Sequence, residues 1–573
     1  MTRPLHALKI PTTVQAILTA RIDRLPAGQK DLLETLAVIG KDFRLGLVSK
    51  VVARPHEELE RTLERLQIGE FIYEQPAAGD IEYRFKHQLT REAAYNSVLI
   101  ERRKALHERV AHAIEELNAN TLGDHIDDLA HHLWEAGTAA DLSKTINSLR
   151  MASHRAVLKG AYETSVSHLR NALELLQKLP PSASRESQEL ALQRALGGTL
   201  MVTKGYAAAD VNTAFQRART LSQVGGDASK QVSVLGGLWA ASFVGGKHRA
   251  AREIAGQALE VAQNQDDPTL LLRAHMMLGL SCLYQGELQL ARIHLQRCRE
   301  LPDQGKYSPH SEDPRVMSRS WLGVALLRLG YPDQGLKTAQ DALSFARQLP
   351  LPRFRNEVYA MNYVATLHME RHEWSGARDV AEKMAEISIA QGLTQWSIAS
   401  NILIGVAIAE QGELAQGAAR LSQALAGWRE TGASTSTPVF MGKLGTFYGR
   451  LGRTTEGLSL LDDALALSLE TGELLDTAEL HRRKGEIILN QMSGSSVGEG
   501  TEGCLLEAIK IARVQAGKYY ELRAAIDLGH LWKKLGRSRQ ARAMLAEIYG
   551  WFTEGFDTAD LKDAKELLDE LHG

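Results

Sequence analysis

The sequence predicts an all-α protein in which a solenoid of helical hairpins follows a small domain with one β-hairpin. Two observations predict the solenoid. In four stretches a small residue is followed by a second small residue 12 positions later, and apolar residues recur at fixed offsets around both. The four pairs are Gly279 with Ala291, Gly323 with Gly335, Gly405 with Gly417, and Gly445 with Gly457. Small residues facing each other let the two backbones approach closely, and the apolar stripe beside them must be covered by the next hairpin.

This spacing is the tetratricopeptide (TPR) pattern, and we expect about ten TPR-like pairs. The anchor residues lie 40 to 44 positions apart; they are Gly279, Gly323, Ala365, Gly405, Gly445, Gly485 and Gly529. A usual TPR unit has about 34 residues, so the surplus predicts longer helices and loops and a looser superhelix. The final helix, from Thr558 to Leu571, has a polar face and is expected to cap the array.

The residues before the repeats predict a different organisation. Residues 1–26 are expected to be an entry segment with one helix, which is capped at residues 10–13, runs to Arg24 and is ended by Leu25-Pro26. Residues 27–98 predict a winged-helix-like domain, because three helices are followed by two alternating stretches and a turn at 76–80. The expected elements are helices 29–39, 45–52 and 55–67 and strands 70–74 and 81–85. Connecting helices occupy 99–145, and the TPR-like superhelix occupies 146–573.

Composition excludes several classes of partner. The chain of 573 residues is 44% hydrophobic and 24% charged, with a formal net charge of −2, so no overall charge draws it to nucleic acid or anionic membrane. Its three cysteines are too few and too scattered for a disulfide framework. No stretch reaches the roughly 20 apolar residues that cross a bilayer, so we expect a cytoplasmic protein without a membrane partner.

The motifs of catalysis are absent from the sequence. Neither Gly40-Lys41 nor Gly246-Lys247 has the upstream glycine and following hydroxyl residue of a phosphate-binding loop. His125, His131 and His132 gather in one predicted helix without the zinc-protease spacing, and we interpret them as packed or exposed residues. The prediction is therefore no catalytic residue, no metal site and no cofactor in this chain.

Nucleic-acid binding is disfavoured by the helix that would enter a DNA groove. Residues 55–65 carry four glutamates against two arginines, which repel phosphate. A domain that packs against another protein domain is the better interpretation.

The first helices of the repeats would line the groove of the superhelix, where a protein or peptide partner is expected. The positions predicted to face it are Met276, Tyr284, Arg328, Tyr359, Asn362 and Arg450. They are chemically mixed, without the lysine and asparagine array that clamps a C-terminal carboxylate. Ordinary packing or solvation of these side chains is the alternative, and the sequence does not name the partner.

Three passages carry a resemblance to a known family: residues 11–26 (PTTVQAILTARIDRLP), residues 83–107 and residues 549–562. They resemble the C-terminal part of bacterial multidomain proteins with a class III adenylate/guanylate cyclase domain, a STAND-type predicted ATPase and a TPR tail. The resemblance covers essentially the whole chain. In that family the cyclase and the nucleotide-binding core precede the segment at Pro11, and only ten residues do so here. None of their catalytic residues is present, which is what a short relative, a split gene product or a truncated gene would show.

The resemblance also implies one site residue. His87 follows the hairpin at the place where STAND proteins can sense the phosphates of a bound nucleotide. Such a role needs ATP and Mg²⁺ on a nucleotide-binding core supplied elsewhere, and a hydrogen-bonded structural histidine is the alternative.

These observations favour a non-enzymatic protein–protein interaction and regulatory module in bacterial signal transduction. Its groove would bind a partner, and the winged helix would couple occupancy to an ATPase or cyclase domain. One alternative is a fragment of a cyclase or ATP-binding STAND ATPase whose catalytic half is absent, which leaves open whether the parent protein is an enzyme. Another alternative is a transcriptional regulator.

Overall fold

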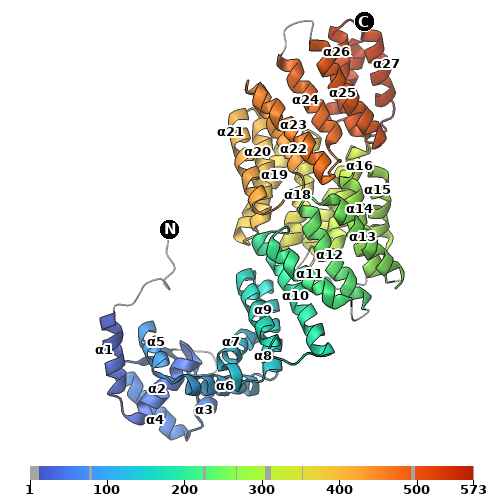
Figure 1. The fold of residues 1–573 in the computed structure, drawn as a ribbon. Helices are drawn as coiled ribbons and strands as arrows, with labels where there is room; N and C mark the ends of the chain where they lie inside the picture. Colours follow the sequence, from blue (N-terminus) through green and yellow to red (C-terminus); the bar gives the residue numbers. More distant parts are fainter. Residues whose placement is uncertain are drawn as a thin grey trace. The chain divides into compact units, whose positions relative to one another are not determined.

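The computed structural model describes residues 12–75, 80–223, 227–265, 267–302, 312–350, 353–491 and 497–571 (Figure 1). Within these ranges the chain is helical apart from one three-stranded sheet, which confirms the predicted fold class. The chain divides into two compact units, 1–156 with 167–185 and 157–166 with 186–573. None of the described helices has the length and apolar character needed to cross a membrane.

The first unit contains the small sheet. Helix α1 (Thr12–Asp23) precedes α2 (Ala27–Ile39), α3 (Leu45–Val52) and α4 (His56–Ile68). Strands β2 (Ile72–Gln75) and β3 (Glu82–Phe85) form the predicted hairpin, whose turn at 76–79 lies outside the described residues. A third strand, β1 (Asp42–Arg44), was not predicted; it pairs antiparallel with β3, giving the order β1-β3-β2. Three residues are too few for an alternating pattern to reveal, and the winged-helix assignment stays a prediction.

Aromatic side chains hold this sheet against the helices. Phe43 of β1 stacks on Tyr83 with ring centroids 6.1 Å apart and meets Phe85 edge-on at 5.8 Å. These rings are buried together with Leu59 and Leu63 of α4, because alternate residues of a strand point to the same face. The unit continues through α5 (Gln88–Ser97), α6 (Ile100–Leu117), η2 (Leu122–His125), α7 (Ile126–Ala136), η3 (Gly137–Ala139) and α8 (Leu142–Leu158).

The second unit is an array of helix pairs. Its helices are α10 (Ala183–Lys204), α11 (Ala209–Ser222), α12 (Ala228–Val244), α13 (His248–Gln263), α14 (Pro268–Tyr284), α15 (Leu288–Glu300), α16 (Pro314–Arg328), α17 (Pro332–Gln348), α18 (Phe354–Glu370), α19 (Trp374–Ala390), α20 (Thr394–Glu410), α21 (Leu414–Glu430), α22 (Thr437–Arg450), α23 (Thr454–Thr471), α24 (Thr477–Gln491), α25 (Val497–Val514), α26 (Lys518–Lys534) and α27 (Ser538–Tyr549). With α8 and α9 (Tyr162–Leu176) they make the ten predicted pairs among the described residues. Helix α28 (Ala559–Glu570) packs on the last pair, as predicted for a cap.

The paired small residues lie where the sequence pattern places them. A Cβ atom added to Gly417 of α21 would lie 2.5 Å from the carbonyl oxygen of Gly405 in α20. No side chain can occupy that space, so only glycine allows the two helices to approach this closely. Gly323 with Gly335 and Gly445 with Gly457 show the same backbone contact.

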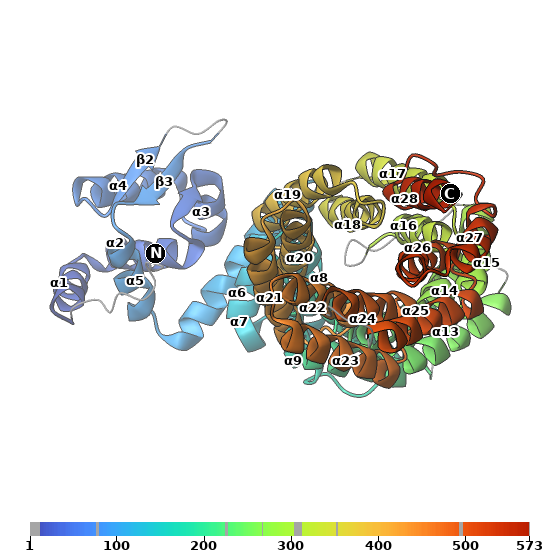
Figure 2. The ribbon, with the colours of Figure 1, turned by 90° about the horizontal axis from the view of Figure 1, so that it is seen from above.

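The superhelix of the second unit winds until its later turn lies on its earlier turn (Figure 2). The N–H groups of Ser434 and Thr435 donate to the carbonyl of Val244, at 2.8 and 3.0 Å. Those of Leu474 and Leu475 donate to the carbonyl of Tyr284, at 2.6 and 3.1 Å. The prediction of a looser superhelix is wrong in this respect, because backbone hydrogen bonds join residues 190 positions apart.

Candidate functional site

The concave face of the second unit contains a cavity of about 150 Å³. Its walls come mainly from the first helix of each pair, α12, α14, α16, α18, α20 and α22. This is the surface on which the sequence predicts a partner. The contacts between turns of the superhelix border it, since Tyr284, Thr435 and Leu475 belong both to those contacts and to the cavity lining.

Aromatic rings form a continuous ladder along the cavity wall. Successive ring centroids lie 4.4 to 5.4 Å apart, in the order Trp239, Phe243, Tyr284, Trp321, Tyr363, Tyr359 and Trp396. Trp321 Nε1 donates to Tyr359 Oη at 2.7 Å, and the hydroxyls of Tyr284 and Ser436 lie 2.9 Å apart. Such a ladder offers ring faces and edges to an apolar or aromatic group.

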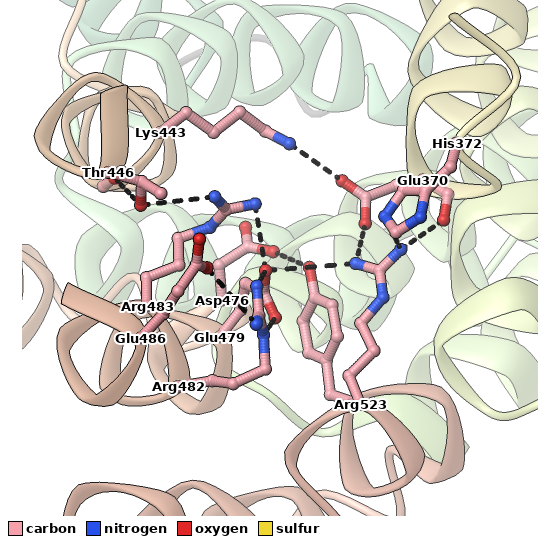
Figure 3. Close-up of polar contacts among 12 residues, drawn as sticks. Glu370, His372, Lys443, Thr446, Asp476, Glu479, Arg482, Arg483, Glu486 and Arg523 are labelled. Carbon is pink, nitrogen blue, oxygen red and sulfur yellow. Dashed lines mark hydrogen bonds and ion pairs between the residues drawn. The ribbon is translucent and has the colours of Figure 1, made fainter. Parts of the chain in front are cut away.

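Buried charged side chains also line the cavity, among them Glu370, Lys443 and Asp476, whose contacts Figure 3 shows. Arg328 pairs with Glu370 at 2.8 Å and with Asp476 at 2.9 Å. Lys443 and Arg523 also point toward Glu370, at 3.6 and 3.0 Å. Each of these five side chains is buried, so every charge depends on its partners rather than on water.

The neighbours decide the protonation of these groups. Burial alone would raise the pKa of Glu370, but Arg328, Lys443 and Arg523 together hold it well below its usual range. Burial raises the pKa of Asp476, which accepts a hydrogen bond from Tyr520 Oη at 2.6 Å. Burial also lowers the pKa of Lys443, against the attraction of Glu370. The wall therefore presents an ammonium group to the cavity, and among the described residues Glu370 is its one counter-ion within 4.0 Å.

A second cavity of about 300 Å³ adjoins the first. Tyr206, Trp239 and Glu312 line both. Glu312 accepts hydrogen bonds from Tyr206 and from Arg355, the latter at 3.0 Å, so the boundary between the cavities is polar. Phe215 and Met277 add apolar surface to the lining of the second cavity, and Arg194 and Arg273 add charge. The two cavities together give the concave face two adjacent binding spaces.

The predicted partner residues fall in three places. Tyr284, Arg328, Tyr359 and Asn362 line the first cavity, and Met276 lines the second. Arg450 lines neither; it forms ion pairs with Glu410 and Glu486, both at 2.9 Å. The structure brings four of the six together, and whether they bind a partner stays a prediction.

The sequence analysis missed the residues that complete the cavity, above all Trp321, Tyr363 and Lys443. A signal for them exists, since each lies two positions before the anchor residue of its repeat. In these three repeats the residue two positions before the anchor lines the first cavity, and its type changes from aromatic at Trp321 and Tyr363 to charged at Lys443.

His87 lies in the first unit as the residue before α5, with an exposed side chain. Its carbonyl accepts a hydrogen bond from the N–H of Thr90 at 3.0 Å. The position after β3 agrees with the sequence, and the role in nucleotide sensing stays a prediction.

Comparison with solved structures gives helical repeat proteins. The Rap protein complexed with competence and sporulation factor matches with a TM-score of 0.46 and 14% identity, over 67% of this chain and 99% of that chain. The Cut9–Hcn1 hetero-tetramer of APC/C matches at 0.43 and 14%, over 82% and 80%. A STAND protein with a tetratricopeptide repeat sensor from Pyrococcus horikoshii matches at 0.34 and 13%, over 73% and 65%.

Comparison of sequences gives a distant relative. No protein-family model matches the chain. The uncharacterized protein R02095 of Rhizobium meliloti (strain 1021) is 21% identical over 537 residues, which make up 91% of this chain and 50% of that protein. The chain spans about half the length of the curated relative it matches.

Proposed function

We propose that the second unit is a protein–protein interaction module that binds a peptide segment in the two cavities of its concave face. The observation that carries the proposal is one cavity lined both by the aromatic ladder and by the buried ammonium group of Lys443. A cavity of about 150 Å³ is large enough for a benzene-sized group and smaller than a typical drug-sized pocket. It therefore suits one anchoring aromatic side chain, with the adjoining cavity for a neighbouring residue.

The charged wall favours an acidic group in the proposed peptide. In the part of the chain that the structure describes, Lys443 has one counter-ion within 4.0 Å, Glu370 at 3.6 Å, which is longer than a direct hydrogen bond. A carboxylate beside the aromatic anchor would give Lys443 a second partner without breaking the first pair. We expect the preferred peptides to combine an aromatic residue with an adjacent acidic group.

Selection from a random peptide library tests this function. Peptides selected on the purified chain are measured against three proteins: the wild type, Asn362→Trp, which fills the first cavity, and Lys337→Trp, a matched control on an exposed side chain of α17. The expected result is equal binding to the wild type and the control, and at least tenfold weaker binding to Asn362→Trp. Failure to select any binder, or equal binding to all three proteins, contradicts the proposal.

The regulatory half of the proposal rests on the family resemblance described above. The small domain with the three-stranded sheet would couple peptide binding to an ATPase or cyclase domain, with His87 facing the nucleotide. The exposure of the His87 side chain leaves it accessible to such a domain. The chain alone is then expected neither to bind nor to hydrolyse ATP, which equilibrium binding of labelled ATP measures directly. Tight ATP binding by this chain would contradict the assignment of nucleotide binding to a separate domain.

A further inference from the structure

Three histidines gather in the first unit where α6 packs against α7. His107 comes from α6, and His131 and His132 come from α7. One ligand atom of each lies within 4.8 Å of those of the other two. His107 and His132 are buried, whereas His131 is exposed. The sequence analysis grouped His131 and His132 with His125 and missed His107, because His107 lies on a different helix.

The two buried imidazoles present the same nitrogen to each other. Nδ1 of His107 and Nδ1 of His132 lie 2.9 Å apart. The other nitrogen of His107, Nε2, lies 3.1 Å from Tyr95 Oη. His132 hydrogen-bonds to the backbone of Ile39. Each outer nitrogen therefore has a partner that fixes the ring.

The two facing Nδ1 atoms allow two arrangements. If one imidazole carries its hydrogen there, that N–H donates to the other ring; if both nitrogens hold lone pairs, a cation between them accepts both. A hydrogen bond uses only these two rings, whereas a ligand atom of a third imidazole, that of His131, lies within 4.8 Å of both. Three imidazole nitrogens gathered at one point are the ligand set of a metal cation.

We propose that His107, His131 and His132 bind one divalent transition-metal cation of the zinc class through one imidazole nitrogen each. Neutral imidazole is the preferred protein ligand of such cations. With metal–nitrogen bonds of about 2.0–2.1 Å, nitrogens 2.9 Å apart subtend an angle of about 90° at the metal, and a small outward shift gives the tetrahedral value. The bonds to Ile39 and Tyr95 are the outer-shell contacts that orient metal-binding histidines.

Access to the site comes from the side of His131. A cavity of about 250 Å³ lies beside it, lined by Tyr95, His131 and Glu135 among others. Water from this cavity can complete the coordination, and the carboxylate of Glu135 adds a negative charge near the metal. The cation would join α6 to α7 and so fix the end of the first unit that follows the sheet.

Metal titration of the untagged full chain tests the site. The protein is stripped with a chelator, titrated with Zn²⁺ alone and passed through gel filtration, and its metal content is measured. We expect one Zn²⁺ per chain, and with Co²⁺ the visible absorption bands of nitrogen coordination. Mg²⁺, which prefers oxygen ligands, is expected not to bind.

Variants locate the metal. His131→Ala removes an exposed ligand that the folded state does not need, and it should weaken Zn²⁺ binding at least tenfold with an unchanged circular-dichroism spectrum. His112→Ala is the matched control, since His112 is a 69% exposed histidine of α6 outside the cluster. His294→Ala tests a second histidine pair, in which Nδ1 of His275 and of His294 also lie 2.9 Å apart. Absence of stoichiometric Zn²⁺ would mean that His107 Nδ1–H donates to His132 instead. That result, or Zn²⁺ lost in His294→Ala and retained in His131→Ala, overturns the proposal.

Discussion

Glu370 joins three cations inside the second unit, and its replacement by glutamine is expected to lower the free energy of unfolding of that unit by about 3–5 kcal/mol. Glutamine keeps the shape of the side chain and removes its charge. Arg328, Arg523 and Lys443 would then lose their shared carboxylate. The substitution isolates the electrostatic contribution from the packing contribution.

The loss of stability depends on which of the three cations keep another carboxylate partner. Arg328 keeps Asp476 at 2.9 Å, and Arg523 keeps Asp560 at 3.1 Å. Lys443 keeps no ion pair within 4.0 Å among the described residues, although its side chain is only 6% exposed. A buried ammonium group without a counter-ion is the main source of the expected loss. Adding Lys443→Met to Glu370→Gln should therefore recover most of it.

Urea unfolding at neutral pH, followed by far-ultraviolet circular dichroism, measures these differences. Glu382→Gln is the matched control, because Glu382 pairs with Arg378 on the surface at 48% exposure, where a pair contributes at most about 1 kcal/mol. The reasoning fails if Glu370→Gln costs less than about 1 kcal/mol, or if Lys443→Met recovers nothing.

The pH dependence of the same variant has a defined sign. The folded-state pKa of Glu370 lies below its unfolded value of about 4.3, so its stabilising effect is present above that value and is lost as the pH falls toward the folded-state pKa. The wild type should lose stability in acid more steeply than Glu370→Gln.

Two further substitutions test the helix pairing and a histidine pair. Gly417→Ala should lower the free energy of unfolding by about 1–3 kcal/mol, because the added Cβ meets the backbone of α20 at 2.5 Å. Gly256→Ala has open space around it and should raise the free energy of unfolding by about 0.5–1 kcal/mol through α13. Thermal unfolding shows whether each variant is less or more stable than the wild type. Burial, with His294 and Arg297 nearby, lowers the pKa of His275 to about 4. The stabilising contribution of the neutral His275 is therefore complete above about pH 6.5. It declines by about 1.4 kcal/mol per pH unit as the pH falls toward 4. Replacing His275 with glutamine should flatten that decline in urea-unfolding experiments from pH 7 to 4, and an unchanged slope contradicts the assignment.

Local patterns explain why the helix pairs were predictable. Gly405 and Gly417 contact each other across one hairpin, so the sequence pattern and the helix contact that it produces lie within a dozen residues of each other. The hairpin of β2 and β3 is equally local. Strand β1 was missed because its formation depends on the edge of β3, about 40 residues later, rather than on a pattern of its own.

Long-range contacts explain why the cavity was not predictable in full. The repeats identify which helices face inward, and so Tyr284, Arg328, Tyr359 and Asn362 were found. The enclosure of the concave face needs the hydrogen bonds of Ser434 to Val244, which no periodicity encodes. The buried charges depend on them too, since Arg328 and Asp476 are 148 positions apart.

The same contacts link the cavity to the winding of the superhelix. The end of α12 meets the start of α22, and the end of α14 meets the start of α24, so about five helix pairs complete one turn. Tyr284 takes part in both features: its carbonyl accepts the N–H groups of Leu474 and Leu475, and its ring lies in the aromatic ladder between Phe243 and Trp321. Its hydroxyl also reaches Ser436 of the later turn. A group that enters the cavity and displaces this ring therefore acts on the hydrogen bonds between turns, which gives the proposed binding event a direct mechanical effect on the array.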